Sequence, residues 1–235
     1  MAQPEKKAAQ MTRDELASYI DYSILKPQFT TEEVVELAHT GINYKCATLC
    51  TNPWALDVVA PLLPGTGVGI CVVADFPFGQ GTAADKEMLA RAYVSRGDIQ
   101  DLDLVINYGL LREGKWQQAA EEIKPAIAVC REAGVVTKVI LETDALDKKA
   151  IEGGVEAVIA AGGDYVKTST GFYTGGPTVG GARDVMAHLI EVTDGRAKVK
   201  ASGNVRDQAH YFDLIDMGVE RIGVGYRSVP VVLGE

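Results

Sequence analysis

An alternation of short apolar runs with longer helix-like segments, repeated eight times, constrains the fold of this chain most strongly. The runs are four to nine residues long, and most are rich in β-branched residues. They comprise residues 21–25, 46–50, 68–76, 102–107, 138–143, 164–170, 198–202 and 221–225. Continuous rather than alternating apolarity is typical of strands that are buried on both faces, as in a parallel sheet.

The segments between the runs carry the signals of helix ends. Thr30 and Thr82 are suitable N-cap residues, and glycine follows the last turn of most segments. Helices are predicted from Thr30 onward and over residues 82–96, 114–133, 145–161, 178–193 and 204–217. Because strand and helix alternate, the chain is predicted to adopt an α/β fold, a closed (β/α)8 TIM barrel. An open doubly wound sheet is the alternative, and the lack of a G-x-G-x-x-G motif after the first run weakens its dinucleotide-binding form.

The whole chain, residues 1–235, is predicted to form a single domain. It contains no linker, low-complexity tract or charge block. Residues 1–10 are polar and rich in alanine, and we expect them to form a flexible tail or a lead-in to a helix.

The charge and the cysteines restrict the partners and the compartment. The net charge is −9 without a long basic run, which argues against nucleic acid or an anionic membrane surface as a partner. An acidic protein can still bind an anionic small molecule in a local positive pocket. Every apolar run falls short of the ~20 residues that span a bilayer, no signal peptide is visible, and the four cysteines form no CxxC pair. We therefore expect reduced thiols and a cytoplasmic location.

Two lysines on neighbouring predicted strands give the strongest sign of chemistry. Lys167 ends a stretch of small and apolar residues, and Lys200 lies in the next run along the chain. Burying an ammonium group is costly, and two cations in one partly dry pocket cannot both stay protonated cheaply, so one should lose its proton. A neutral amine in a pocket attacks carbonyls and forms a Schiff base. The protonated imine then withdraws electrons, which allows a neighbouring C–C or C–H bond to break.

An aspartate is the candidate proton carrier for such chemistry. Asp103 lies within its predicted strand, two residues before Val105. A carboxylate near two lysines can relay a proton through water, or it can neutralise one lysine in a salt bridge. The spacing alone leaves both interpretations open.

Glycines follow the last three predicted strands. Gly171, Gly203, Gly223 and Gly225 place backbone N–H groups where many (β/α)8 barrels bind phosphate. Glycine is also common in such loops for steric reasons, so this signal alone does not define an anion site. The three histidines form no H-x-H or H-x-x-x-H pair, and no metal site is expected.

Several stretches, in one consistent order, resemble the class I deoxyribose-phosphate aldolases, which work through a lysine Schiff base. The most specific is VKTSTGF at residues 166–172, and the others include YIDYSILKP, ADFPFGQGT, DLDLVINYGLLREG and VKASGNVR. The resemblance extends over residues 16–228 and implies a (β/α)8 fold. It further implies reversible cleavage of 2-deoxyribose 5-phosphate to acetaldehyde and glyceraldehyde 3-phosphate, without a cofactor, by a homo-oligomer that is a dimer or a tetramer.

The same resemblance assigns roles to particular residues. It places the Schiff-base lysine on Lys167, the lysine that perturbs it on Lys200, and the proton-relay aspartate on Asp103. The substrate-binding residues expected within the matching stretches are Asp21, Cys50, Thr168, Thr170, Gly171, Gly203, Asn204, Arg206, Gly223, Gly225 and Arg227. Of these, Cys50 is expected to line the pocket rather than to react.

The chain departs from the family pattern where the family holds the substrate phosphate. Gly203-Asn204 stands where two glycines are usual, and Gly225-Tyr226 stands where two serines are usual. Asn204 is expected to adopt a left-handed backbone, which asparagine tolerates. Arg206 and Arg227 can compensate through charge-assisted bonds to phosphate. Two alternatives therefore stay open: an aldolase of the same type for a non-phosphorylated or bulkier 3-hydroxy aldehyde, and a catalytically idle barrel that binds a sugar phosphate.

Overall fold

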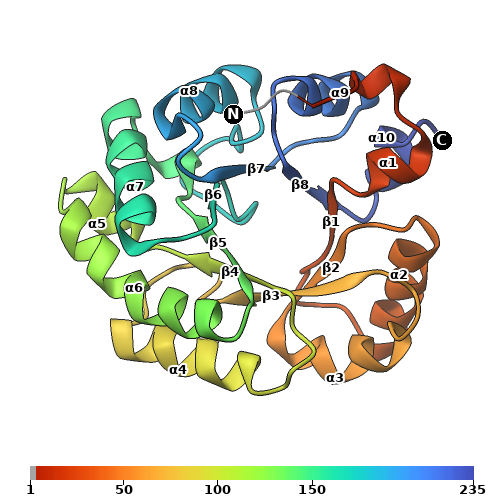
Figure 1. The fold of residues 1–235 in the computed structure, drawn as a ribbon, viewed down its shortest axis with the longest axis horizontal. Helices are drawn as coiled ribbons and strands as arrows, with labels where there is room; N and C mark the ends of the chain where they lie inside the picture. Colours follow the sequence, from red (N-terminus) through yellow and green to blue (C-terminus); the bar gives the residue numbers. More distant parts are fainter. Residues whose placement is uncertain (1–3) are drawn as a thin grey trace.

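The computed structural model of the protein describes residues 4–235 and forms a closed barrel of eight parallel strands surrounded by helices (Figure 1). The strands are β1 (Ile20–Ile24), β2 (Thr48–Thr51), β3 (Gly69–Ala74), β4 (Asp101–Val105), β5 (Val136–Ile140), β6 (Tyr165–Lys167), β7 (Lys198–Ser202) and β8 (Arg221–Gly225). The α-helices are α1 (Arg13–Ala17), α2 (Thr31–Asn43), α3 (Leu56–Val59), α4 (Ala83–Val94), α5 (Tyr108–Arg112), α6 (Trp116–Glu132), α7 (Lys148–Ala161), α8 (Arg183–Thr193), α9 (Gln208–Asp216) and α10 (Val229–Val232).

Consecutive strands pair in parallel, and β1 closes the barrel by pairing with β8. The predicted (β/α)8 barrel is therefore confirmed, and the open doubly wound sheet is wrong. Each of the eight apolar runs overlaps a strand, and β7 and β8 have the predicted bounds. β6 is shorter than predicted because the chain leaves the sheet after Lys167.

Capping boxes confirm two of the predicted helix starts. The Thr30 side chain accepts a hydrogen bond from the Glu33 backbone N–H, and the Glu33 carboxylate accepts one from the Thr30 N–H. Thr82 and Asp85 form the same reciprocal pair at the start of α4. Each pair satisfies two N–H groups that a helix cannot satisfy internally.

The helices α8 and α9 begin later than predicted. α8 begins at Arg183 rather than near Thr178, because the Gly181 N–H binds the Gly203 carbonyl oxygen at 3.1 Å. A Cβ atom at position 181 would lie 2.3 Å from that oxygen, so the close approach of the two loops requires glycine. α9 begins after Asp207, whose side chain caps it, whereas Asn204 has the expected left-handed φ, 60°.

Part of the expected N-terminal tail packs on the barrel. Residues 1–3 lie outside the described residues, but Ala8–Gln10 form a short 3₁₀ helix. Ala8 is fully buried, and its N–H binds the Asp216 carboxylate of α9 at 2.8 Å. Ala8–Gln10 therefore form a lead-in to α1 rather than a flexible tail, because burial and this hydrogen bond fix the segment.

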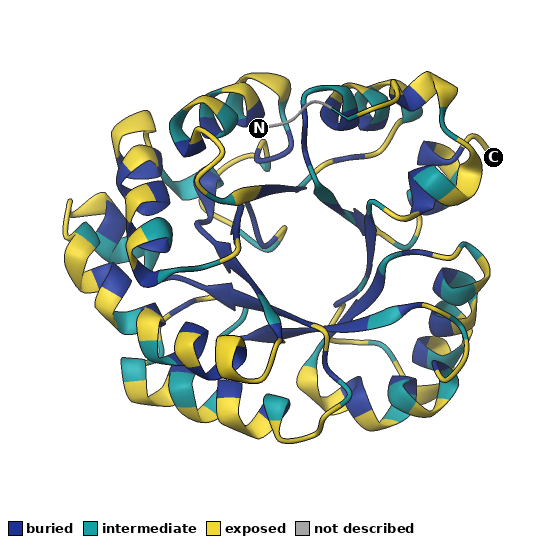
Figure 2. Cartoon of the chain, in the orientation of Figure 1, coloured by how far each residue is buried: buried dark blue, intermediate teal, exposed yellow. Residues whose placement is uncertain are grey.

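The strands separate an apolar layer from a charged interior. In β4, Leu102 and Leu104 belong to the main apolar core, whereas Asp101 and Asp103 contact charged groups inside the barrel. Figure 2 shows strands buried along most of their length and helices that are buried mainly on the side facing the barrel. Hydrophobic stabilisation therefore comes mostly from the layer between strands and helices.

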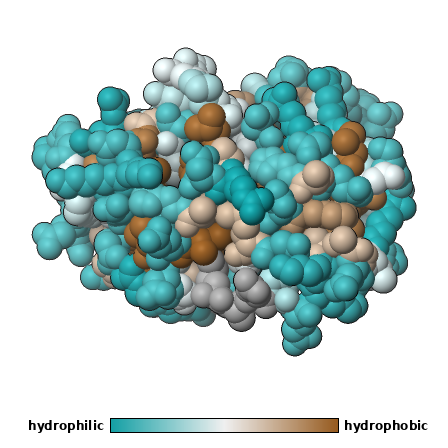
Figure 3. Space-filling model, turned by 90° about the horizontal axis from the view of Figure 1, so that it is seen from above, coloured by the Kyte–Doolittle hydropathy of each residue, from teal (hydrophilic) through white to brown (hydrophobic). Residues whose placement is uncertain are grey.

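The outer surface is mixed. On the edge of the molecule that carries α8 and α9 it is mainly hydrophilic, with separate hydrophobic patches (Figure 3). Among the residues described, no helix has both the length and the apolar composition needed to cross a bilayer.

Candidate active site

The three residues predicted to react meet inside the barrel. The Asp103 Oδ2 atom accepts hydrogen bonds from Lys167 Nζ at 2.6 Å and from Lys200 Nζ at 2.7 Å. Lys167 and Lys200 are register partners on β6 and β7, so their side chains project from the same level of the barrel wall. The predicted proximity of the two lysines is therefore observed.

These residues belong to a larger buried charge network. Its members are Asp21 on β1, Asp101 and Asp103 on β4, Lys138 on β5, Lys167 on β6, Lys200 on β7 and Arg221 on β8. Lys138 Nζ lies 2.6 Å from Asp101, 3.2 Å from Asp103 and 3.4 Å from Asp21. Asp21 also binds Lys200 at 2.5 Å and Arg221 at 3.1 Å.

Three members of this network were not predicted from the sequence: Lys138, Asp101 and Arg221. Lys138 opens an apolar run, where a lysine commonly marks the end of a strand. The sequence signal that could have identified Lys138 is its strand register. Lys138 is the partner of Asp103 across β4 and β5, so the two side chains face the same interior of the barrel.

Burial and the charge network act in opposite directions on each ionisable group. Burial raises the pKa of Asp103, but Lys138, Lys167 and Lys200 outweigh it and hold that pKa well below its usual value. Burial lowers the pKa values of Lys138 and Lys200, but Asp103 and Asp21 outweigh it and raise both. The pKa of Asp21 is lowered for the corresponding reason. These four groups are therefore charged at neutral pH.

The network holds four cationic side chains and three carboxylates. It thus carries one excess positive charge if every basic group is protonated. Lys200 pairs with two carboxylates and Lys138 with three, whereas Lys167 pairs only with Asp103 among residues 4–235. An excess charge in a buried site is costly, and Lys167 is the lysine of the network with the fewest carboxylate partners.

A cavity of about 510 Å³ opens onto Lys167. The Lys167 side chain is 4% exposed, whereas those of Lys138 and Lys200 are 0% exposed. Eight of the predicted substrate-binding residues line this cavity: Thr170, Gly171, Gly203, Asn204, Arg206, Gly223, Gly225 and Arg227. A ligand in the cavity therefore meets Lys167 and not the other two lysines.

The lining is positively charged although the protein is acidic. Lys26, Lys167, Arg206 and Arg227 line the cavity, and none of its described lining residues is Asp or Glu. Ser23, Gln28, Ser202 and Ser228 add neutral polar groups. The cavity is suited to a small anionic ligand with hydroxyl groups.

Three predicted substrate-binding residues lie outside this lining. Asp21 is fully buried beneath the cavity and holds Lys200 and Arg221. The Thr168 hydroxyl donates to the Ser202 carbonyl oxygen at 2.8 Å and accepts from the Ser202 N–H at 2.9 Å, so it joins the carboxyl ends of β6 and β7 rather than facing a ligand.

The third of these residues, Cys50, lies in an apolar wall. It packs with Leu25, Cys71 and Val73, against which Phe76 and Phe172 also pack. The Cys71 thiol donates to Asp103 Oδ1 at 3.2 Å. Cys50, Cys71 and Asp103 form the one group of potential metal ligands found in residues 4–235, but lysines already occupy both oxygens of Asp103.

The loop after β5 fixes the loop that carries the VKTSTGF stretch. Glu142 is buried with a left-handed φ of 59°, and its carboxylate accepts hydrogen bonds from the Thr170 hydroxyl and, at 3.3 Å, from the Thr170 N–H. Burial raises the pKa of Glu142. Asp144 accepts a hydrogen bond from the Val179 N–H at 2.7 Å. Two carboxylates thus hold two points of the loop between β6 and α8.

The altered loops after β7 and β8 keep their place at the cavity. Tyr226 turns its ring edge-on to Phe29, with ring centroids 5.4 Å apart, and the Arg227 guanidinium lies 5.2 Å from the Tyr226 ring centroid. The Tyr226 side chain therefore forms part of the cavity wall next to Gly225.

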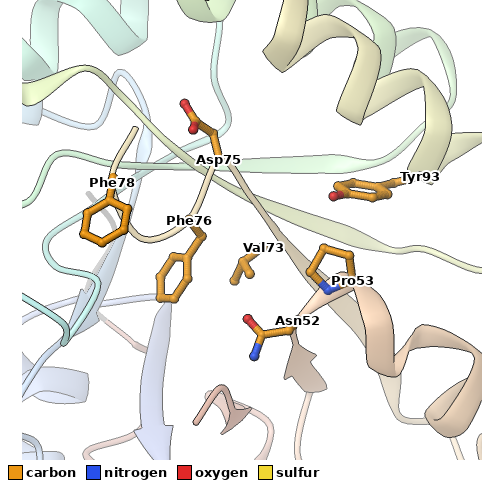
Figure 4. Close-up of a pocket in the computed structure, with 7 residues that line it drawn as sticks. All are labelled: Asn52, Pro53, Val73, Asp75, Phe76, Phe78 and Tyr93. Carbon is orange, nitrogen blue, oxygen red and sulfur yellow. The ribbon is translucent and has the colours of Figure 1, made fainter. Parts of the chain in front are cut away.

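A second, smaller cavity of about 230 Å³ lies beyond β2 and β3. Figure 4 shows that the Phe76 and Val73 side chains point toward it, while the Asp75 carboxylate points away. That carboxylate instead binds the buried Lys86 at 2.7 Å and the Gly81 N–H at 2.9 Å. Phe76 of this loop packs edge-on against Phe172 in the lining of the larger cavity, with ring centroids 5.4 Å apart, so the loop supports the wall of the larger cavity.

A (β/α)8 barrel whose cavity opens onto one buried lysine, with a second lysine and an aspartate in contact behind it, has the architecture of a class I, lysine-dependent aldolase. No protein-family model matches the chain. The chain is 37% identical over 208 residues to the deoxyribose-phosphate aldolase of Desulfitobacterium hafniense, which covers 88% of this chain and 93% of that protein. It is also 37% identical over 221 residues to that of Macrococcus caseolyticus, covering 94% and 96%.

A solved structure agrees with these relatives. The deoxyribose phosphate aldolase from Aeropyrum pernix, described as a unique tetrameric structure, matches with a TM-score of 0.83 and 30% identity. The match covers 94% of this chain and 91% of the Aeropyrum chain. The chain belongs to the deoxyribose-phosphate aldolase family.

Proposed function

We propose that the protein reversibly cleaves 2-deoxyribose 5-phosphate into acetaldehyde and glyceraldehyde 3-phosphate, with Lys167 as the Schiff-base residue. The observation that carries the proposal is the positively charged cavity in which Lys167 alone, of the three interior lysines, is accessible. Its volume of about 510 Å³ suits a sugar phosphate.

The first step is formation of the imine. The neutral Lys167 amine attacks the C1 aldehyde of the open-chain sugar, and water leaves as the protonated imine forms. The charge count explains why Lys167 supplies the amine: loss of its proton leaves three cations facing three carboxylates. Lys200 stays protonated because Asp21 and Asp103 both bind it.

The second step is cleavage of the C2–C3 bond. The C3 hydroxyl loses its proton, C3 becomes the aldehyde of glyceraldehyde 3-phosphate, and the bond electrons move to C2 as an enamine. A proton returned to C2 regenerates the imine, which water hydrolyses to acetaldehyde and free Lys167. Asp103, in contact with both lysines, is the group placed to relay these protons through water, and Lys200 stabilises its charge.

The phosphate end is the part of the substrate that the altered loops contact. Arg206 and Arg227 provide charge, and the backbone near Gly171, Gly203 and Gly223 provides N–H donors. Asn204 and Tyr226 add side chains where the family pattern has small residues. We therefore expect a phosphorylated substrate to be accepted with weaker phosphate selectivity than the family pattern would give.

The presence of Tyr226 in the cavity wall supports a second candidate, an aldolase for a non-phosphorylated or bulkier 3-hydroxy aldehyde. The discriminating measurement is kcat/KM for 2-deoxyribose 5-phosphate and for 2-deoxyribose. Preference for the plain sugar would replace the first candidate with the second. An idle barrel is disfavoured because all three reacting residues are present and in contact.

The proposal extends to the oligomeric state and the cellular location of the protein. We infer a homo-oligomer, a dimer or a tetramer, from the tetrameric Aeropyrum pernix relative. A cytoplasmic location is supported by the four cysteines, all of which are free and buried.

Covalent trapping tests the central assignment. The enzyme is incubated with acetaldehyde and borohydride, and peptide mass spectrometry locates the reduced two-carbon adduct. We expect labelling at Lys167 only. Lys198→Met, which removes a lysine at the start of β7 outside the charge network, is the matched control and should label normally. An adduct at Lys200 or Lys138, or none, would refute the assignment.

A further inference from the structure

Lys26 reaches across the mouth of the cavity. It follows β1, and its Nζ atom lies 4.7 Å from the centroid of the Phe172 ring, which belongs to the loop after β6. β1 and β6 are separated in the barrel by β7 and β8. The contact between Lys26 and Phe172 therefore bridges two loops that do not neighbour each other, in the lining of the cavity that also contains Lys167.

The Lys26 ammonium has no carboxylate partner within the described chain, because no ion pair among residues 4–235 includes it. The surrounding lining offers it only neutral groups and the cations Lys167, Arg206 and Arg227. A cation on an aromatic ring at an exposed site is weakly held. A charge-assisted bond to a phosphate oxygen is stronger, so a bound anion can draw the ammonium from the ring.

We propose that Lys26 binds the phosphate of the substrate. Among the cationic residues that line the cavity, Lys26 is the one on the loop after β1. Phe172 holds the ammonium over the cavity before the substrate enters. This inference rests on the proposed function for the identity of the substrate. It explains how the chain retains a phosphate site although Asn204 and Tyr226 replace small residues at the loops after β7 and β8.

Paired kinetics with Lys26→Met test the inference, since methionine keeps much of the apolar stem and removes the charge. We expect kcat/KM for 2-deoxyribose 5-phosphate to fall about tenfold or more and kcat/KM for 2-deoxyribose to stay within about twofold. Lys26→Arg should retain the preference. Lys198→Met is the matched control: Lys198 also lies over a ring, 5.4 Å from the centroid of Tyr165, but at the opposite end of the barrel.

Two outcomes would overturn the inference. An equal loss for both sugars would show that Lys26 only shapes the mouth of the cavity, and no loss for either would show that it contacts no part of the substrate. Calorimetric binding of inorganic phosphate separates this inference from the proposed function, since it needs no turnover. We expect the phosphate Kd to rise about tenfold in Lys26→Met and not in Lys198→Met. A wild type that binds phosphate but cleaves neither sugar would refute the proposed function alone.

Discussion

Replacing Lys200 by leucine should convert Lys167 from a nucleophile into a structural cation. The two lysine nitrogens bind the same Asp103 oxygen, at 2.6 and 2.7 Å. Unit charges about 4–5 Å apart repel by roughly 3–4 kcal/mol at an effective dielectric constant of about 20. In Lys200→Leu this repulsion disappears, and the remaining three cations and three carboxylates balance only while Lys167 stays protonated.

This charge balance determines the direction in which the pH profile of Lys200→Leu should move. The acid limb of the kcat/KM profile should therefore move upward by about two to three pH units, at about 1.36 kcal/mol per unit. At neutral pH the variant should lose roughly a hundredfold to a thousandfold in kcat/KM and recover much of it under alkaline conditions. Lys200→Arg keeps the charge and should keep the acid limb close to its wild-type position.

The assay is kcat/KM from pH 5 to pH 10, together with the rate of borohydride trapping by acetaldehyde at each pH. A melting curve verifies that Lys200→Leu is folded at each pH used. A large loss of activity with an unshifted acid limb would refute the reasoning, because it would mean that Lys200 acts as a proton donor or a spacer rather than through its charge.

Four further predictions concern the surroundings of Lys167. Lys138→Met removes the buried cation that pairs with Asp21, Asp101 and Asp103. It should lower the free energy of unfolding, measured by urea denaturation, by about 3–5 kcal/mol. Glu142→Gln gives Thr170 one acceptor fewer and should raise KM more than it lowers kcat. Burial raises the pKa of Glu142 in the folded protein. The wild type should therefore lose stability relative to this variant as the pH rises above the pKa that the carboxyl has in the unfolded chain. Gly181→Ala places a Cβ 2.3 Å from the Gly203 oxygen and should cost about 1–3 kcal/mol of stability and weaken phosphate binding, whereas unchanged melting and Kd would contradict the close approach. Prolonged EDTA treatment should leave full activity, and a loss that zinc restores would contradict a metal-free reaction.

Much of the barrel could be predicted because each of its signals is local. Apolar runs mark strands that are buried on both faces, and the hydroxyl and acidic residues at Thr30 and Thr82 mark helix starts wherever the chain places them. The start of α8 could not be predicted from Thr178, because the Gly181–Gly203 contact joins two loops that only the closed barrel brings together.

The site was predictable where a residue's position in a strand determines the direction of its side chain. Lys167 and Lys200 end or lie within apolar runs on adjacent strands, and this places them together. Lys138 was missed because its role depends on cross-strand register with Asp103 rather than on its immediate neighbours. Lys26 was missed because a loop residue carries no periodicity that tells where its side chain points.

The buried charge network has a consequence for the end of the barrel that holds no ligand. Arg221, the first residue of β8, is 20% exposed, and through Asp21 it connects to Lys200 and hence to Asp103 and Lys167. In (β/α)8 barrels the end opposite the active site is usually associated with stability alone. Here that end and Lys167 belong to one network of charged side chains. A surface redesign that neutralised Arg221, far from any substrate contact, would thereby change the balance of charge around Lys167.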